Sequence, residues 1–130
     1  MNMTFAAAAA VAGGGAIGAL ARWMLNIAFG EAGSPIPLGT LAANLVGGLL
    51  MGITIGVLDQ FDTLPVPVRL AITTGFLGGL TTFSTFSGET VTFMLRQQWG
   101  LTVAIVTLHV VGSVLATLLG VALVRLLLRA

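Results

Sequence analysis

Four long apolar stretches alternate with short segments rich in glycine, proline, serine and acidic residues along this chain. About 20 apolar residues in a helix cross the roughly 30 Å of a bilayer's hydrocarbon core, so each stretch is long enough to span a membrane. The pattern predicts an all-α membrane protein with a single domain over residues 1–130. Its four transmembrane helices are expected at residues 3–29, 38–58, 68–98 and 99–124.

Composition supports the same class. Of the 130 residues, 57% are hydrophobic and 7% are charged, whereas a typical soluble domain has about 25% charged residues. The chain has no cysteine, one histidine and four acidic residues, which leaves little for a disulfide framework, a metal centre or a hydrolytic triad. The net charge of +1 excludes a basic nucleic-acid face. We therefore expect a membrane protein that is not an enzyme.

The first apolar run has a second interpretation, because residues 3–21 also resemble the apolar part of a signal peptide. A signal peptide begins with a positively charged leader, and no lysine or arginine precedes Arg22. We expect a retained first span.

The third stretch contains an unusual run, Gly75-Phe-Leu-Gly-Gly-Leu-Thr-Thr-Phe-Ser-Thr-Phe86. Its three glycines each cost a helix about 1 kcal/mol relative to alanine, and hydroxyls follow where a lipid-facing helix uses leucine or valine. Irregular backbone at membrane depth is tolerated only where protein buries it or where it lines a wet cavity. The run predicts a helix broken in mid-membrane. The alternative is that the glycines only permit close helix packing.

Arginine placement bears on orientation in the membrane. Four helices put both termini on one side, together with Arg69, Arg125 and Arg129, whereas Arg22 and Arg96 fall on the opposite side. Three against two is almost no bias under the positive-inside rule. A chain balanced in this way can insert in both orientations and form an antiparallel, dual-topology homodimer. The alternative is a weakly biased protein that takes one orientation.

Polar and aromatic residues recur at helical spacing in three of the spans. Polar groups in hydrocarbon are costly without partners, so these positions are expected to face the interior of the bundle or water. Three such stripes favour a conduit over interhelical hydrogen bonding alone. The stripes consist of Thr40 and Asn44 on the second helix, Phe83, Phe86 and Glu89 on the third, and His109, Ser113 and Thr117 on the fourth.

The chemistry of these stripes suits a small anion that must shed water. Amide and hydroxyl groups donate hydrogen bonds, and the edges of phenylalanine rings are electropositive. The broken backbone offers the opposite chemistry, because carbonyls freed near Gly78 and Thr81 can hold a cation such as Na⁺. Two charged residues remain at the edge of the predicted bundle. Arg22 is either interfacial or part of a vestibule, and Glu89 has either a structural or a pore-mouth role.

Two motifs together resemble the Fluc (CrcB) family of fluoride channels. One is Gly39-Thr-Leu-x-x-Asn44-x-x-Gly47, and the other is the glycine-to-phenylalanine run that ends at Phe86. Gly18-x-x-x-Arg22 fits as well, so the resemblance covers nearly the whole chain. It implies an antiparallel homodimer with two pores that passively conducts F⁻ out of a microbial cell across its inner membrane.

The resemblance also assigns roles to individual residues. It implies an anion path lined by Phe83, Phe86, Asn44, Thr40, Ser84, Thr85, Ser113 and Thr117. It further implies a structural Na⁺ held by the backbone carbonyls of Gly78 and Thr81. His109 occupies a position where members carry serine or another polar residue, so its role is open. Ile105 stands where some members carry a tyrosine.

Two other functions compete with fluoride conduction for a chain of four short apolar helices. A proton-coupled small multidrug exporter needs a membrane-embedded carboxylate in its first helix, and residues 3–21 contain none. A non-conducting assembly subunit would carry hydroxyl stripes without a matched phenylalanine pair or a helix break. Fluoride export has a clear rationale, because HF crosses membranes neutral and ionises inside, where F⁻ is trapped.

Overall fold

The computed structural model describes residues 4–30, 33–61 and 63–129, and of residue 129 it describes the backbone only. Residue 3, the expected start of the first span, lies outside the described residues. The described part is helical, with four segments long and apolar enough to cross a membrane. The helices are α1 (Phe5–Phe29), α2 (Leu38–Gln60), α3 (Val66–Leu70), the π-helical η1 (Ala71–Leu77), α4 (Gly78–Leu80), α5 (Phe83–Leu95) and α6 (Trp99–Arg129).

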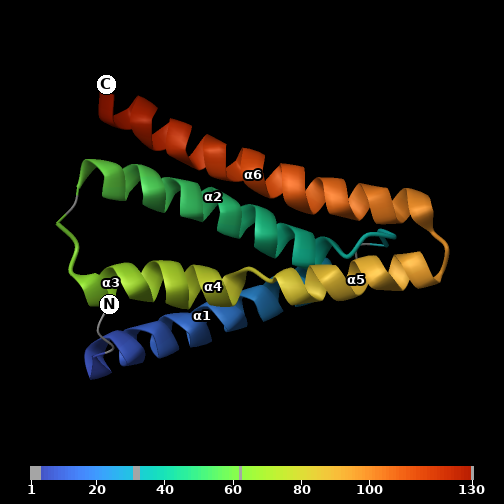
Figure 1. The fold of residues 1–130 in the computed structure, drawn as a ribbon, viewed down its shortest axis with the longest axis horizontal. Coiled ribbons are helices and arrows are strands. Elements are labelled where there is room, and N and C mark those ends of the chain that lie inside the picture. Colours follow the sequence, from blue (N-terminus) through green and yellow to red (C-terminus); the bar gives the residue numbers. More distant parts are fainter. Residues whose placement is uncertain (1–3, 31–32, 62, 130) are drawn as a thin grey trace.

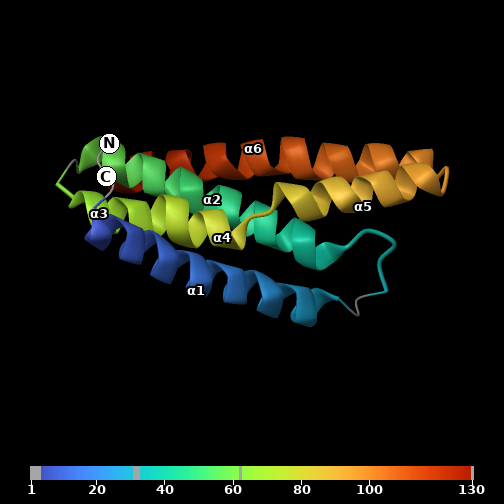
Figure 2. The same ribbon diagram turned by 60° about the horizontal axis from the view of Figure 1, so that its bottom comes forward.

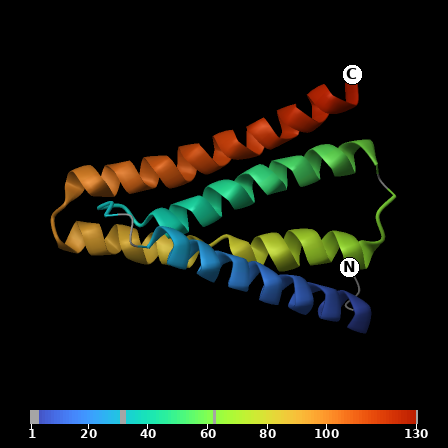
Figure 3. The ribbon, with the colours of Figure 1, turned by 180° about the vertical axis from the view of Figure 1, so that it is seen from behind.

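The four segments run alternately up and down, so both ends of the described chain lie at the same end of the bundle (Figure 1). The third segment comprises α3, η1, α4 and α5. α2 lies between α6 and the first part of this segment, whereas α5 packs directly against α6. α1 covers the opposite side of the third segment from α6 (Figure 2). Seen from behind, α1 crosses the third segment near its middle (Figure 3).

The third segment is bent where α4 ends and α5 begins. Thr81 (φ −83°, ψ 157°) and Thr82 (φ −151°, ψ 117°) are both extended and separate the two helices. Threonine suits this junction because the Thr82 hydroxyl caps α5 by accepting a bond from the Thr85 N–H. The break therefore falls just after the glycines rather than among them.

Two glycines of the third segment, Gly75 and Gly79, pack against α1. A Cβ on Gly75 would lie 2.8 Å from the Val11 carbonyl oxygen, and a Cβ on Gly79 would lie 3.0 Å from the Ala19 nitrogen. These two positions accept only glycine, because the neighbouring atoms belong to the backbone of another helix. The packing interpretation is thus the correct one for Gly75 and Gly79, and small residues here let two membrane helices approach closely.

Small residues also bring α2 and α6 together. A Cβ on Gly52 would lie 3.0 Å from the Gly120 Cα, and a Cβ on Gly120 would lie 2.7 Å from the Ile53 nitrogen. Six of the buried apolar side chains form two clusters, one of Ala43, Leu77 and Leu80 and the other of Phe86, Phe93 and Ile105. The first cluster lies before the break and the second after it, so the extended pair sits between two packed regions.

Candidate functional site

The break is bound directly to α2 through one side chain. The Thr82 N–H donates to Asn44 Oδ1 over 2.8 Å, and Asn44 Nδ2 donates to the Thr82 carbonyl over 3.1 Å. Thr82 is buried, and buried backbone groups need partners. Asn44 supplies both partners and replaces the helical hydrogen bonds that the extended backbone cannot make.

Two rings lie next to this amide. His109 Nδ1 is 2.9 Å from Asn44 Nδ2, and the imidazole stacks on Phe86 with ring centroids 4.5 Å apart and planes inclined by 26°. Phe86 in turn meets Phe83 edge to face, at 5.5 Å and 71°. An amide, an imidazole and two phenylalanines from three segments thus form one cluster, which we call the ring cluster (Asn44, Phe83, Phe86 and His109).

The members of the ring cluster differ in exposure. Phe86 and His109 are only 7% and 4% exposed, whereas Phe83 is 76% exposed. Phe83 therefore points out of the single chain, toward lipid or toward a second molecule. Its edge-to-face contact leaves one ring inside the bundle and one at its surface.

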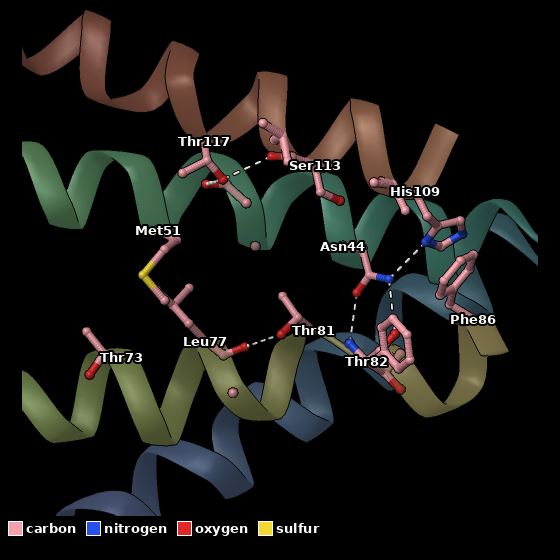
Figure 4. A pocket seen from close by; sticks show the side chains of 16 residues that line it. Asn44, Met51, Thr73, Leu77, Thr81, Thr82, Phe86, His109, Ser113 and Thr117 are labelled. Carbon is pink, nitrogen blue, oxygen red and sulfur yellow. Dashed lines mark hydrogen bonds between the residues drawn. The ribbon is translucent and has the colours of Figure 1, made fainter. Parts of the chain in front are cut away.

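A cavity of about 460 Å³ lies between α2, α6 and the third segment, and the ring cluster lines it. Figure 4 shows its labelled residues projecting from these three segments. Among the lining residues, Thr117 donates its hydroxyl to the Ser113 and Gly48 carbonyls over 2.9 and 3.0 Å. The polar members of the lining are Asn44, Thr73, Thr81, Thr82, His109, Ser113 and Thr117.

Two of the expected lining residues face a different cavity. Thr40 and Glu89 line a second space of about 250 Å³, which Asn26 and the segment before α2 complete. The Thr40 hydroxyl donates to Glu89 Oε1 over 2.6 Å, a short bond of the kind that charged acceptors make. Glu89 Oε2 is buried and has no partner among the described residues.

Ser84 and Thr85 are exposed and line neither cavity. The Thr82 hydroxyl donates to Thr85 Oγ1 over 3.0 Å and lies 3.3 Å from Ser84 Oγ. Both residues thus belong to the first turn of α5 and help to shape its start. Arg22 is half-buried on α1 and is likewise absent from the lining of the two cavities.

Gly78 and Thr81, the expected cation ligands, both line the larger cavity. The Thr81 N–H and hydroxyl both donate to the Leu77 carbonyl, over 3.0 and 2.9 Å. The next amide along, that of Thr82, is bound to Asn44 and so does not turn back to Gly78. Gly78 is exposed on the surface of the single chain.

Sequence reasoning missed the role of Thr82, whose backbone holds the Asn44 amide. A threonine followed three residues later by a hydroxyl residue, directly after a glycine-rich helix, is an N-cap signal that could have indicated it.

Comparison with known proteins places the chain in a family. Residues 9–121 match the model of the family described as "CrcB-like protein, Camphor Resistance (CrcB)". The chain is 47% identical over 116 residues to a protein of Nitrosospira multiformis named fluoride-specific ion channel FluC, covering 89% of this chain and 91% of that protein. It is 48% identical over 116 residues to the protein of that name from Ralstonia pickettii, covering 89% and 92%.

A third relative of the same name, from Albidiferax ferrireducens, is 49% identical over 108 residues, covering 83% of this chain and 82% of that protein. The similarity thus extends over nearly all of the four helical segments. The chain belongs to the CrcB (Fluc) family of multi-pass membrane proteins.

Proposed function

We propose that this protein is a passive, fluoride-selective ion channel that releases F⁻ from the cytoplasm of a bacterium through its inner membrane. The observation that carries the proposal is the ring cluster, an amide and three rings lining a cavity in a chain whose relatives are named fluoride-specific channels. A passive pore suffices, because a membrane potential negative inside drives an anion outward with about 2.3 kcal/mol per charge per 100 mV.

The path proposed for F⁻ runs along the larger cavity and past Phe83 and Phe86 toward Thr40 and Glu89. In the larger cavity the ion passes Ser113 and Thr117 of α6. Ser113 offers its hydroxyl, whereas the Thr117 hydroxyl is directed to the Ser113 and Gly48 carbonyls. At the phenylalanines it meets ring edges, which are electropositive and can contact an anion that has lost its water shell. Selectivity would follow from a narrow, largely apolar passage with few donors.

An antiparallel homodimer would complete this path. Its support is Phe83, which is 76% exposed although it contacts Phe86 and lines the cavity. A second copy packed on this face would cover the ring and close the cavity. The near-even distribution of arginines along the sequence fits two copies in opposite orientations.

The end of α4 fits a small structural cation such as Na⁺. The Thr82 N–H is engaged by Asn44, so the Gly78 carbonyl lacks the donor that a continued helix would give it. Thr81 is extended, so its carbonyl lies outside either helix, and the C-terminal end of a helix favours positive charge. Two carbonyls per chain become four when two copies meet. The cation would supply charge that holds these ends together.

Ion efflux from liposomes tests the proposal. Purified protein is reconstituted into liposomes loaded with KF or KCl, valinomycin is added to carry K⁺, and the released anion is measured with an electrode. We expect rapid release of F⁻ and retention of Cl⁻. Equal release of both anions, or release of neither, would contradict the proposal. Phe83→Ile with Phe86→Ile is the matched variant, and it should abolish F⁻ release without dispersing the assembled protein.

A non-conducting assembly subunit remains the competing function. Release of F⁻ in the same experiment would exclude it, and release of neither anion would favour it. A multidrug exporter is disfavoured by the absence of a carboxylate in residues 3–21. Its substrate would be a cation, and proton-driven uptake of a cationic dye into the same liposomes would favour it over the channel.

A further inference from the structure

His109 is the only histidine of the chain, and it sits at the centre of the ring cluster. Its side chain is 4% exposed and lies between two defined neighbours. One ring face stacks on Phe86, and Nδ1 is 2.9 Å from Asn44 Nδ2. Figure 4 shows one ring nitrogen turned toward Asn44 and the other turned away from it.

Two backbone groups fix the orientation of the Asn44 amide. The Thr82 N–H can only donate, so the Asn44 atom 2.8 Å from it is the oxygen. The Thr82 carbonyl can only accept, so the Asn44 atom 3.1 Å from it is the nitrogen. No ambiguity remains about which end of the amide faces His109.

The amide orientation then fixes the proton on the imidazole. An amide nitrogen donates hydrogen bonds and accepts none, so His109 Nδ1 must accept from it with a lone pair. In the neutral ring the proton therefore lies on Nε2. The two N–H groups of Asn44 are at the same time directed to the Thr82 carbonyl and to His109 Nδ1. Asn44 thus has no further hydrogen to offer to an anion.

The Nε2–H group is the donor left over. Nε2 is buried and has no hydrogen-bond partner among the described residues. A buried donor without a partner is uncommon in proteins and calls for an explanation such as a ligand or a water molecule. In the proposed channel, F⁻ on the anion path would be that ligand.

The position of the ring along the bundle agrees with this. Asn44 lines the larger cavity, and Thr40, one helical turn earlier on α2, lines the smaller one. On α5, Phe86 and Glu89 are divided between the two cavities in the same way, three residues apart. Asn44, Phe86 and His109 all line the larger cavity, and Asn44 and Phe86 each lie one helical turn from a residue that lines the smaller one. An ion that leaves the larger cavity toward Thr40 and Glu89 would therefore pass His109.

We propose that His109 Nε2–H is the hydrogen-bond donor that F⁻ meets as it passes between the two cavities. Asn44 is then a positioning residue, which locks the neutral ring in the Nε2–H form and aims it. The inference rests on the proposed function, because it names a binding group for the anion of that channel. In this proposal the His109 imidazole, and not the Asn44 amide, donates the hydrogen bond to F⁻.

Three substitutions at this position separate donation from packing. Glutamine places an amide N–H near the position of Nε2, asparagine places an amide near Nδ1 only, and phenylalanine keeps the stacked ring without either nitrogen. We expect His109→Gln to retain F⁻ efflux. His109→Asn and His109→Phe should lose about 10–100-fold, the effect of one hydrogen bond to a charged group. Wild-type flux in His109→Phe, or more flux in His109→Asn than in His109→Gln, would overturn the proposal.

Nitrogen-15 NMR of the wild-type protein gives a test that does not depend on the variants folding. Labelled histidine yields signals from a single ring, because the chain has one histidine. We expect a protonated Nε2 and an unprotonated Nδ1, with NaF shifting the Nε2 signal and NaCl leaving it in place. A proton on Nδ1 would refute the role of His109. So would an Nε2 signal that NaF does not shift while the protein still releases F⁻, and neither result would contradict the channel function. Absence of F⁻ release together with absence of any shift would refute both.

Discussion

The contact of α1 with the third segment makes a sharp prediction, because two glycines on α1 should respond to alanine in opposite directions. A Cβ on Gly18 would overlap the Phe76 carbonyl oxygen and lie 2.8 Å from the Leu80 nitrogen, whereas a Cβ on Gly13 would have no atom within 4 Å. The obstructing atoms are backbone atoms of a neighbouring helix, so they cannot rotate away. Relief requires α1 to move by roughly 1 Å to restore ordinary contact distances.

The magnitudes follow from these distances. Alanine gains about 1 kcal/mol over glycine in a helix interior, and overpacking of a tight contact costs about 1–3 kcal/mol, occasionally more. Because the clash at Gly18 is with backbone, we take the upper end, which leaves a net loss of about 2 kcal/mol for Gly18→Ala. Gly13→Ala changes only the helix propensity, so it should raise the free energy of unfolding by about 0.5–1 kcal/mol.

Melting in detergent, followed by the fluorescence of the two tryptophans, measures both effects. At roughly 3–5 °C per kcal/mol for a chain of this size, Gly18→Ala should melt about 6–10 °C below wild type and Gly13→Ala about 2–5 °C above it. Gly18→Ala should also reduce F⁻ efflux, since Leu80 is the last residue of α4 before the extended Thr81–Thr82 pair. Equal melting temperatures for the two variants would refute the packing derived for α1.

Three further predictions concern the polar contacts and the assembly. Asn44→Ala should lower the stability by about 2–4 kcal/mol, because it strands the buried N–H and carbonyl of Thr82, and melting of the variant measures this. Thr40→Val should cost about 1.5–3 kcal/mol by removing the hydrogen bond to the Glu89 carboxylate. Thr92→Val, at an exposed position whose hydroxyl bonds back to its own helix, should stay within about 0.5 kcal/mol and serves as the control. A single cysteine introduced into the α2–α3 loop of this cysteine-free chain should react with membrane-impermeant reagents from both sides of the membrane, and reaction from one side only would contradict dual topology.

The four helical segments were predictable from the sequence, because the bilayer imposes a length on each apolar run and that length can be read along one dimension. The irregularity of the third segment was also predictable, from the run Gly75 to Phe86. What the composition of that run did not reveal was which residues are irregular. The sequence pointed to the glycines, and the structure has them helical while Thr81 and Thr82 are extended.

The reason is that the effect of a glycine depends on what lies opposite. Gly75 and Gly79 remain helical because α1 packs against them and leaves no space for a Cβ. The break occurs where the backbone finds other partners, at the Asn44 amide and the Thr82 hydroxyl. Such partners come from another helix, and helical spacing alone does not pair Asn44 with a residue 38 positions later.

The same limit applies to the polar stripe on α2. Thr40 and Asn44 are four residues apart and share a helix face, which predicted a common lining. The structure divides them between two cavities, with Thr40 beside Glu89 and Asn44 beside His109. Helical spacing identifies which residues face inward. The neighbouring helices decide which cavity each of these residues lines.

These contacts make the helix break and the proposed ion path a single unit. Asn44 holds the extended backbone at Thr82 with one pair of hydrogen bonds and directs the His109 imidazole with a third. An anion drawing on the Nε2–H of His109 would polarise the ring and make Nδ1 a better acceptor for the Asn44 amide. Binding of F⁻ at His109 should then strengthen the hydrogen bond that orients Asn44, and with it the support of the extended backbone at Thr82. A channel built in this way can remain open without a moving gate, because its ligand stabilises the backbone conformation that forms the site.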